Sequence, residues 1–109
     1  MCASVITAKP KSASTVQHHG EQDAIIYAVS GRGVLLTSPA DENSEPTRHE
    51  LVPGDFAFVP AWTEHQALNE SEGEDMVWVV IRSGPVPVEV SLTSWGGPQI
   101  EDRPRGKNV

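Results

Sequence analysis

The chain has 109 residues and a formal net charge of −7, and it contains no apolar run long enough to span a membrane. This length predicts one small soluble domain with a modest hydrophobic core. The negative charge repels phosphate backbones and anionic lipid, so neither nucleic acid nor a membrane surface is an expected partner. A single cysteine, Cys2, allows no internal disulfide, and no secretory signal pattern is present, which together predict a cytoplasmic protein.

Short segments rich in β-branched and aromatic residues recur along the chain between turn residues. They cover residues 25–29, 33–37, 55–59, 64–69 and 76–82. Each has the usual length of a strand, and no window of ten or more residues carries a helical apolar stripe free of glycine and proline. The pattern predicts a single all-β domain over 1–109, a sandwich or closed barrel with its core at about 14–96. We interpret Gly31-Arg32-Gly33 as a hairpin turn and 99–109 as a flexible tail.

A group of residues with fixed spacing lies near the middle of the chain. From Gly54 the sequence reads GDFAFVPAWTEHQALN, which contains Gly54, Pro60, His65 and Asn69. This spacing resembles the second conserved motif of the cupin family: glycine, five residues, proline, one residue, glycine, two residues, histidine, three residues, asparagine. Only the second glycine differs, because Trp62 occupies its position. The resemblance implies a cupin double-stranded β-helix, or jelly-roll, barrel.

An earlier stretch, QHHGEQDAIIYAVSG, resembles the first cupin motif more loosely. Counting back from Gly31 places Gln17 and His19 at the two histidine positions of that motif and Ala24 at its glutamate position. The run HHGEQDAIIYAVSGRG is also similar to short single-cupin proteins of filamentous fungi, some of which are encoded near biosynthetic genes. That similarity implies a role in small-molecule metabolism.

Side-chain alternation supports a common site for these residues. Gln17 and His19 share one face of a strand, and His65 and Asn69 share one face of another. Neutral imidazole suits Fe, Zn or Ni, and an oxygen ligand extends the choice to Mn. The cupin resemblance therefore implies one divalent ion, Fe, Zn, Mn or Ni, held by Gln17, His19, Gln22 and His65. A bulge in the strand would exchange the roles of His18 and His19.

Small and apolar residues on the inward faces predict a cavity for a small organic molecule. The residues that we expect to contact this molecule are Ile26, Ala28, Phe58, Trp62, Trp78 and Asn69. Trp62 has two open interpretations: it covers the mouth of the pocket and stacks on a planar substrate, or it simply packs against the protein. Arg82 ends a strand, where a solvated side chain is the simpler interpretation and a carboxylate-binding one the alternative.

The leading hypothesis is a metal-dependent cupin enzyme with His19 and His65 as its catalytic residues. Its substrate would be small, apolar or aromatic, and oxygenated, and the reaction a dioxygenation, decarboxylation, isomerisation or cyclisation. Two alternatives stay open: a cupin that binds a small ligand with little or no metal and without turnover, and a metal-free acid–base enzyme that uses the barrel histidines. The resemblance also implies a homodimer, for which residues 3–8 form a suitable edge strand.

Overall fold

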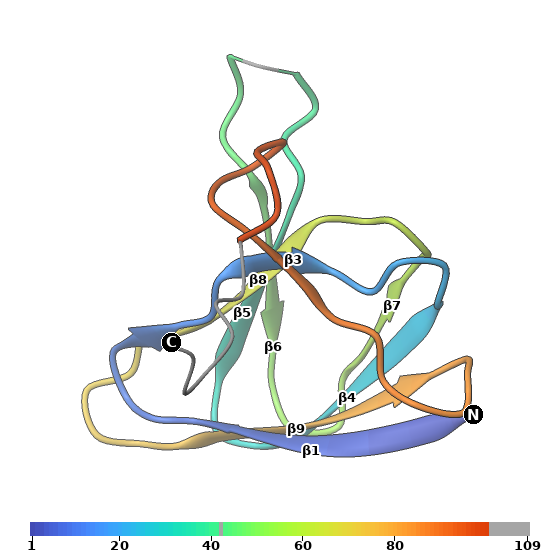
Figure 1. Cartoon of the computed structure of the whole chain (residues 1–109). Helices are drawn as coiled ribbons and strands as arrows, with labels where there is room; N and C mark the ends of the chain where they lie inside the picture. Colours follow the sequence, from blue (N-terminus) through green and yellow to red (C-terminus); the bar gives the residue numbers. More distant parts are fainter. Residues whose placement is uncertain (42, 101–109) are drawn as a thin grey trace, which may run out of the picture.

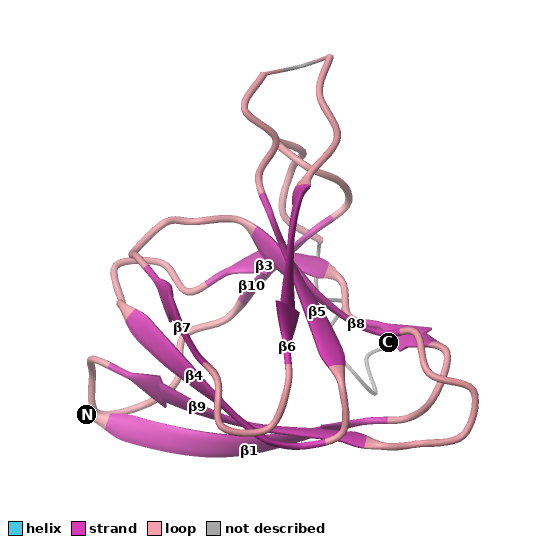
Figure 2. Ribbon diagram, turned by 180° about the vertical axis from the view of Figure 1, so that it is seen from behind, coloured by secondary structure: helices cyan, strands magenta, loops and turns pink. Residues whose placement is uncertain are grey.

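The computed structural model describes residues 1–41 and 43–100. In these ranges the regular elements are β-strands (Figures 1 and 2). The strands are β1 (Cys2–Ala8), β2 (Ser12–Ala13), β3 (Val16–His18), β4 (Ala24–Ser30), β5 (Gly33–Thr37), β6 (Thr47–Leu51), β7 (Phe56–Val59), β8 (His65–Asn69), β9 (Met76–Arg82) and β10 (Val90–Leu92). Within the same residues no helix is long and apolar enough to cross a membrane.

The strands form two antiparallel sheets that enclose the core. One sheet has the order β1-β9-β4-β7 and the other the order β10-β3-β8-β5-β6, with β2 paired to β8. Figure 1 shows β1 and β9 along one side of the molecule and β3, β5 and β8 along the other. The predicted all-β jelly-roll barrel is confirmed.

Alternation along β9 explains how the interior is filled. Met76, Trp78 and Val80 are each at most 2% exposed, whereas the residues between them are half-buried. The inward residues of β4 and β7 pack against them, with Leu35 and Leu51 from the opposite sheet. Because successive side chains of a strand point to opposite faces, one face of each strand supplies this core.

Gly31 and Gly33 make a corner between the two sheets. The predicted hairpin turn at this place is wrong, because β4 and β5 belong to different sheets and do not pair. Gly31 has φ 72°, in the left-handed region that glycine adopts without steric cost. A Cβ atom at Gly33 would collide with the side chains of Met76 and Trp78. The corner therefore needs glycine both for its backbone angles and for the close approach of the core.

The five segments predicted as strands correspond to β4, β5, β7, β8 and β9. The expected flexible tail, 99–109, falls outside the described residues from position 101 onward. Its first two residues are bonded to β10: Gln99 forms a bridge with Leu92, and the Ile100 N–H donates to the Ser91 carbonyl at 2.8 Å.

Candidate functional site

His19 and His65 meet inside the barrel. Their ring centroids lie 4.6 Å apart in an edge-to-face arrangement, and each residue is 3% exposed. His65 opens β8 and lies opposite Gln17 of β3 in the sheet register. His19 follows the last residue of β3, so the local turn and not the strand sets its direction.

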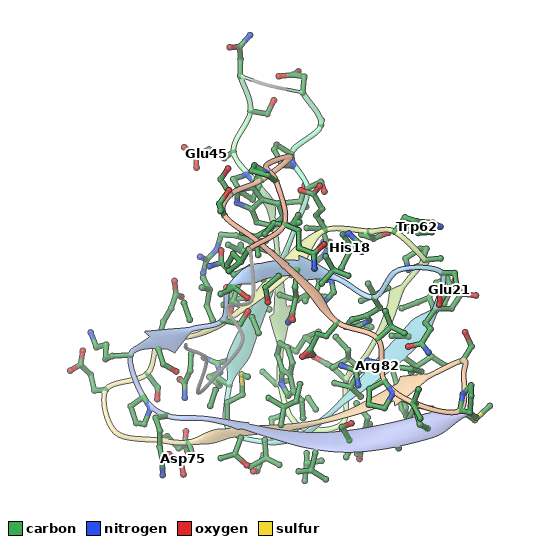
Figure 3. All side chains as sticks on the ribbon, viewed as in Figure 1. His18, Glu21, Glu45, Trp62, Asp75 and Arg82 are labelled. Carbon is green, nitrogen blue, oxygen red and sulfur yellow. The ribbon has the colours of Figure 1, made fainter. Side chains whose placement is uncertain are left out.

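The turn after β3 separates the two neighbouring histidines. Gly20 has φ 57°, and the Gln22 N–H closes the turn by donating to the His19 carbonyl at 3.1 Å. His18 turns outward, accepts a hydrogen bond from the Gly20 N–H on its Nδ1, and contacts Trp62 with ring centroids 5.6 Å apart. His19 is therefore the histidine of this pair that faces the interior (Figure 3 shows His18 beside Trp62).

Both interior histidines are neutral at pH 7. Burial lowers the pKa of His19 from 6.5 to about 3, aided by the repulsion that a protonated His19 would meet from His65 and from the Arg82 cation. Burial also lowers the pKa of His65. The His65 Nδ1 lies 3.0 Å from the Thr63 carbonyl oxygen, which can only accept, so Nδ1 carries the proton and Nε2 keeps its lone pair.

A cavity of about 20 Å³ adjoins the two rings. It is lined by Ile6, Gln17, His19, Ile26, Leu35, His65, Ala67, Trp78, Val80 and Arg82. This volume accommodates about one water-sized group. The expectation of a cavity large enough for an organic molecule is wrong, because Trp78 and its branched neighbours fill the space that the small alanines would leave.

Arg82 also belongs to this site, whereas the simpler interpretation of the sequence placed it in solvent and the alternative placed it against a carboxylate. It is 3% exposed, and its inward position follows from its even spacing with Met76, Trp78 and Val80 along β9. Its Nη2 donates to Glu89 Oε1 at 3.0 Å and its Nη1 to Ser4 Oγ at 3.3 Å. Figure 3 shows Arg82 between the two layers of strands, beside the segment that follows β9. Strand parity was the signal that could have placed it correctly.

Gln22 does not line the cavity, although it was predicted as a metal ligand. Its Nε2 donates to the Val86 carbonyl at 2.7 Å, and its Oε1 accepts from the Val88 N–H at 3.0 Å. A Cβ atom at Gly84 would collide with the same amide. Gln22 thus fastens residues 83–89, called here the β9–β10 segment, against the end of the barrel.

The predicted substrate-contacting residues divide into three groups. Ile26 and Trp78 line the cavity, and Ala28 is buried in the core without reaching it. Asn69 is 1% exposed, but its amide bonds the backbone of Ala8, Ser71 and Glu74, which holds the connection between β8 and β9. The other two, Phe58 on the outer face of β7 and Trp62, are 63% and 65% exposed. Phe58 and Asn69 are therefore placed away from the interior site, contrary to prediction.

Trp62 has an unusual backbone conformation at the position where the motif has glycine. Its φ is 66°, and its N–H donates to the Gly20 carbonyl at 2.8 Å. A side chain in this region costs about 1–2 kcal/mol. Gly20 in turn lies close to Val88, since a Cβ atom there would approach the Val88 side chain to 3.1 Å. Trp62 therefore sits beside the end of the barrel that the β9–β10 segment covers.

Comparisons with known proteins agree with this architecture. The Cupin domain family matches residues 4–82. Peruvianin-I, a cysteine peptidase from Thevetia peruviana latex, superposes with a TM-score of 0.72 at 13% identity, covering 83% of this chain and 54% of its own. A sugar phosphate isomerase of the cupin superfamily from Silicibacter pomeroyi DSS-3 has a TM-score of 0.63 at 23% identity, over 84% of this chain and 56% of its own.

An oxalate decarboxylase from Lactobacillus farciminis, solved as a formate complex, has a TM-score of 0.70 at 19% identity, over 83% of this chain and 26% of its own. No curated protein sequence matches. The chain thus spans little more than half the length of the first two structures, and at these identities the likeness concerns the fold. The family match extends over well more than half of the chain, and with the two-sheet barrel it shows that the chain belongs to the cupin family.

Proposed function

We propose that this cupin binds a small oxygen-bearing organic ligand through His19 and His65 and that it does so without a resident metal ion. The observation that carries the proposal is the pair of buried, neutral imidazoles beside the Arg82 guanidinium in one cavity. A neutral imidazole offers one hydrogen-bond donor and one acceptor, so the pair can recognise a hydroxyl, carbonyl or carboxyl group. The polar end of a ligand would enter the cavity.

A divalent ion, which the cupin resemblance implies, does not fit these residues. The donors beside the cavity are two imidazoles and the Gln17 amide, and none is anionic. Residues 1–41 and 43–100 contain no group of three His, Cys, Asp or Glu side chains arranged to hold a metal. The carboxylate position of the motif is the buried Ala24, the Gln22 amide is bonded to backbone, and the Arg82 cation repels a second positive charge.

Ligand entry requires movement of the β9–β10 segment. The cavity holds only about one water-sized group, whereas even a three-carbon ligand is several times larger. In Figure 1 the segment runs from the end of β9 in one sheet toward β3 in the other, and its contacts to the barrel include the Gln22 amide and the Arg82–Glu89 ion pair. Exposed Trp62 and half-buried His18 next to this end would contact the part of the ligand that stays outside the cavity.

The test is a nitrogen-detected NMR titration of the histidine rings, before and after dialysis against EDTA. The probes are acetate, catechol and acetone, which present a carboxylate, hydroxyls and a carbonyl. We expect at least one probe to shift the ring signals of both His19 and His65, equally with and without EDTA. His65→Ala should lose this binding, while His49→Ala, at an exposed position of β6, should retain it.

Two results would overturn the proposal. One is a transition metal at about one ion per chain in protein purified without a histidine tag, together with loss of binding after EDTA. The other is the absence of any shift at both rings with all three probes. Because the wild-type rings report binding directly, the test does not depend on the folding of the His65 variant.

Proton transfer by His65 is a second candidate function. Its Nδ1–H is held by the Thr63 carbonyl, which leaves Nε2 as an acceptor on a ring that lines the cavity. A base oriented in this way could take a proton from a bound ligand. Turnover of a ligand that persists in EDTA and disappears in His65→Ala would favour this candidate over binding alone.

A further inference from the structure

Arg82 is a buried cation whose hydrogen-bonding capacity is only partly used. It has five N–H donors in a planar fork, but Glu89 engages it through one carboxylate oxygen and Ser4 through a long contact of 3.3 Å. Its Nε has no partner. A guanidinium binds best when two parallel N–H groups meet both oxygens of one carboxylate. The Arg82 guanidinium therefore has N–H donors that this arrangement leaves unused.

The cavity next to Arg82 is rich in unpaired donors. Among the described residues, the buried side-chain polar atoms without a partner are His19 Nδ1, Trp78 Nε1 and Arg82 Nε. All three belong to residues that line the same 20 Å³ cavity. The indole and guanidinium nitrogens can only donate. Buried donors of this kind are normally satisfied, so the set favours an acceptor with negative charge.

Glu89 reaches this cation from the outside. Its side chain is 48% exposed, whereas that of Arg82 is 3% exposed, so the carboxylate lies between the solvent and the cavity. Glu89 is the last residue of the β9–β10 segment, and the proposed function requires this segment to move before a ligand can enter. An exposed carboxylate loses less on leaving the pair than the buried cation does, because water solvates it readily. A second carboxylate can thus replace it.

We propose that Arg82 binds the carboxylate of the ligand and that Glu89 occupies the guanidinium until the ligand displaces it. The ligand class is then a small organic carboxylate, with His19 and His65 beside its oxygens. This inference rests on the proposed function, because it assigns the chemistry of the ligand at the same site. It also explains why the cation is buried at the covered end of the barrel.

The experiment measures by calorimetry how tightly acetate and formate bind. Each carboxylate replaces an equal amount of chloride, so that the ionic strength stays constant. Glu89→Gln removes the competing charge and keeps the shape, so we expect both anions to bind on the order of tenfold more tightly than to wild type. The matched control is Glu72→Gln, which removes an exposed carboxylate paired with Lys11. Arg82→Lys in the Glu89→Gln background should lose the gain, because lysine lacks the two-pronged geometry.

Equal affinity in wild type, Glu89→Gln and Glu72→Gln would overturn the displacement. Retention of the gain in the Arg82→Lys background would show that Arg82 is not the anion site. Either result leaves the histidine titration with catechol or acetone untouched, so the failure of this inference and the failure of the proposed function are separate results.

Discussion

Lowering the pH from 6.5 to 4 should destabilise the folded protein by about 3 kcal/mol through His19 alone. The pKa of His19 is lowered from 6.5 to about 3 by burial, so between these values the unfolded chain binds a proton that the folded chain excludes. The contribution of neutral His19 to the free energy of unfolding is therefore fully present above pH 6.5 and is lost as the pH falls toward 3. The lowered pKa of His65 acts in the same direction.

Urea unfolding at pH 4, 5, 6 and 7 measures this effect. Carboxylates also contribute at the acid end, so the informative quantity is the difference between wild type and His19→Asn. In His19→Asn the free energy of unfolding should fall less steeply with decreasing pH than in wild type. The difference in slope should be about 1.4 kcal/mol per pH unit, the value that corresponds to one proton. His49→Gln, which removes an exposed histidine of β6, should keep the wild-type slope. Parallel profiles for wild type and His19→Asn would show that His19 accepts a proton in the folded protein.

The strand prediction succeeded where the chain alternates between apolar residues and clear turn signals. The limits of β5 and β9 match the predicted 33–37 and 76–82, because Gly and Asp residues bound runs of valine, leucine and tryptophan. Strand β6, Thr47–Leu51, carries a largely exposed TRHEL sequence without that alternation. The sequence still predicts His49 on a strand surface before the Pro53-Gly54 turn, and His49 is exposed on β6; the pairing of β6 with β5 depends on tertiary contact.

The two histidines were identified by motif spacing, but the rest of the site depends on how the barrel is filled. A solvated side chain was the simpler interpretation of Arg82 and carboxylate binding the alternative, although its parity with Trp78 pointed inward. The cavity volume follows from the bulk of Trp78 and its neighbours, which one strand's pattern does not determine. Gln22 lies two residues before β4 begins, so strand parity does not apply to it.

Gln22→Ala should destabilise the protein by about 2–3 kcal/mol and release the β9–β10 segment. The substitution removes a side chain that is 4% exposed and leaves both the Val86 carbonyl and the Val88 N–H without their protein partner. The Val88 amide should then exchange with deuterium faster than in wild type. Gln66→Ala removes one bond, to the Ser14 carbonyl, and should leave the exchange of Val88 unchanged.

Gln22→Glu separates the two bonds of the amide. A carboxylate still accepts from the Val88 N–H, but it cannot donate to the Val86 carbonyl and sets a buried negative charge against that oxygen, so Gln22→Glu should destabilise the protein at least as much as Gln22→Ala. Loss of bound metal from Gln22→Ala, with unchanged stability and unchanged Val88 exchange, is what a metal ligand would show. If Gln22 instead holds the β9–β10 segment over the ligand entrance, Gln22→Ala should destabilise the protein. It should also speed both the hydrogen exchange of the Val88 amide and the association of acetate. The Gln22 variants therefore connect the stability of the β9–β10 segment to access to His19, His65 and Arg82.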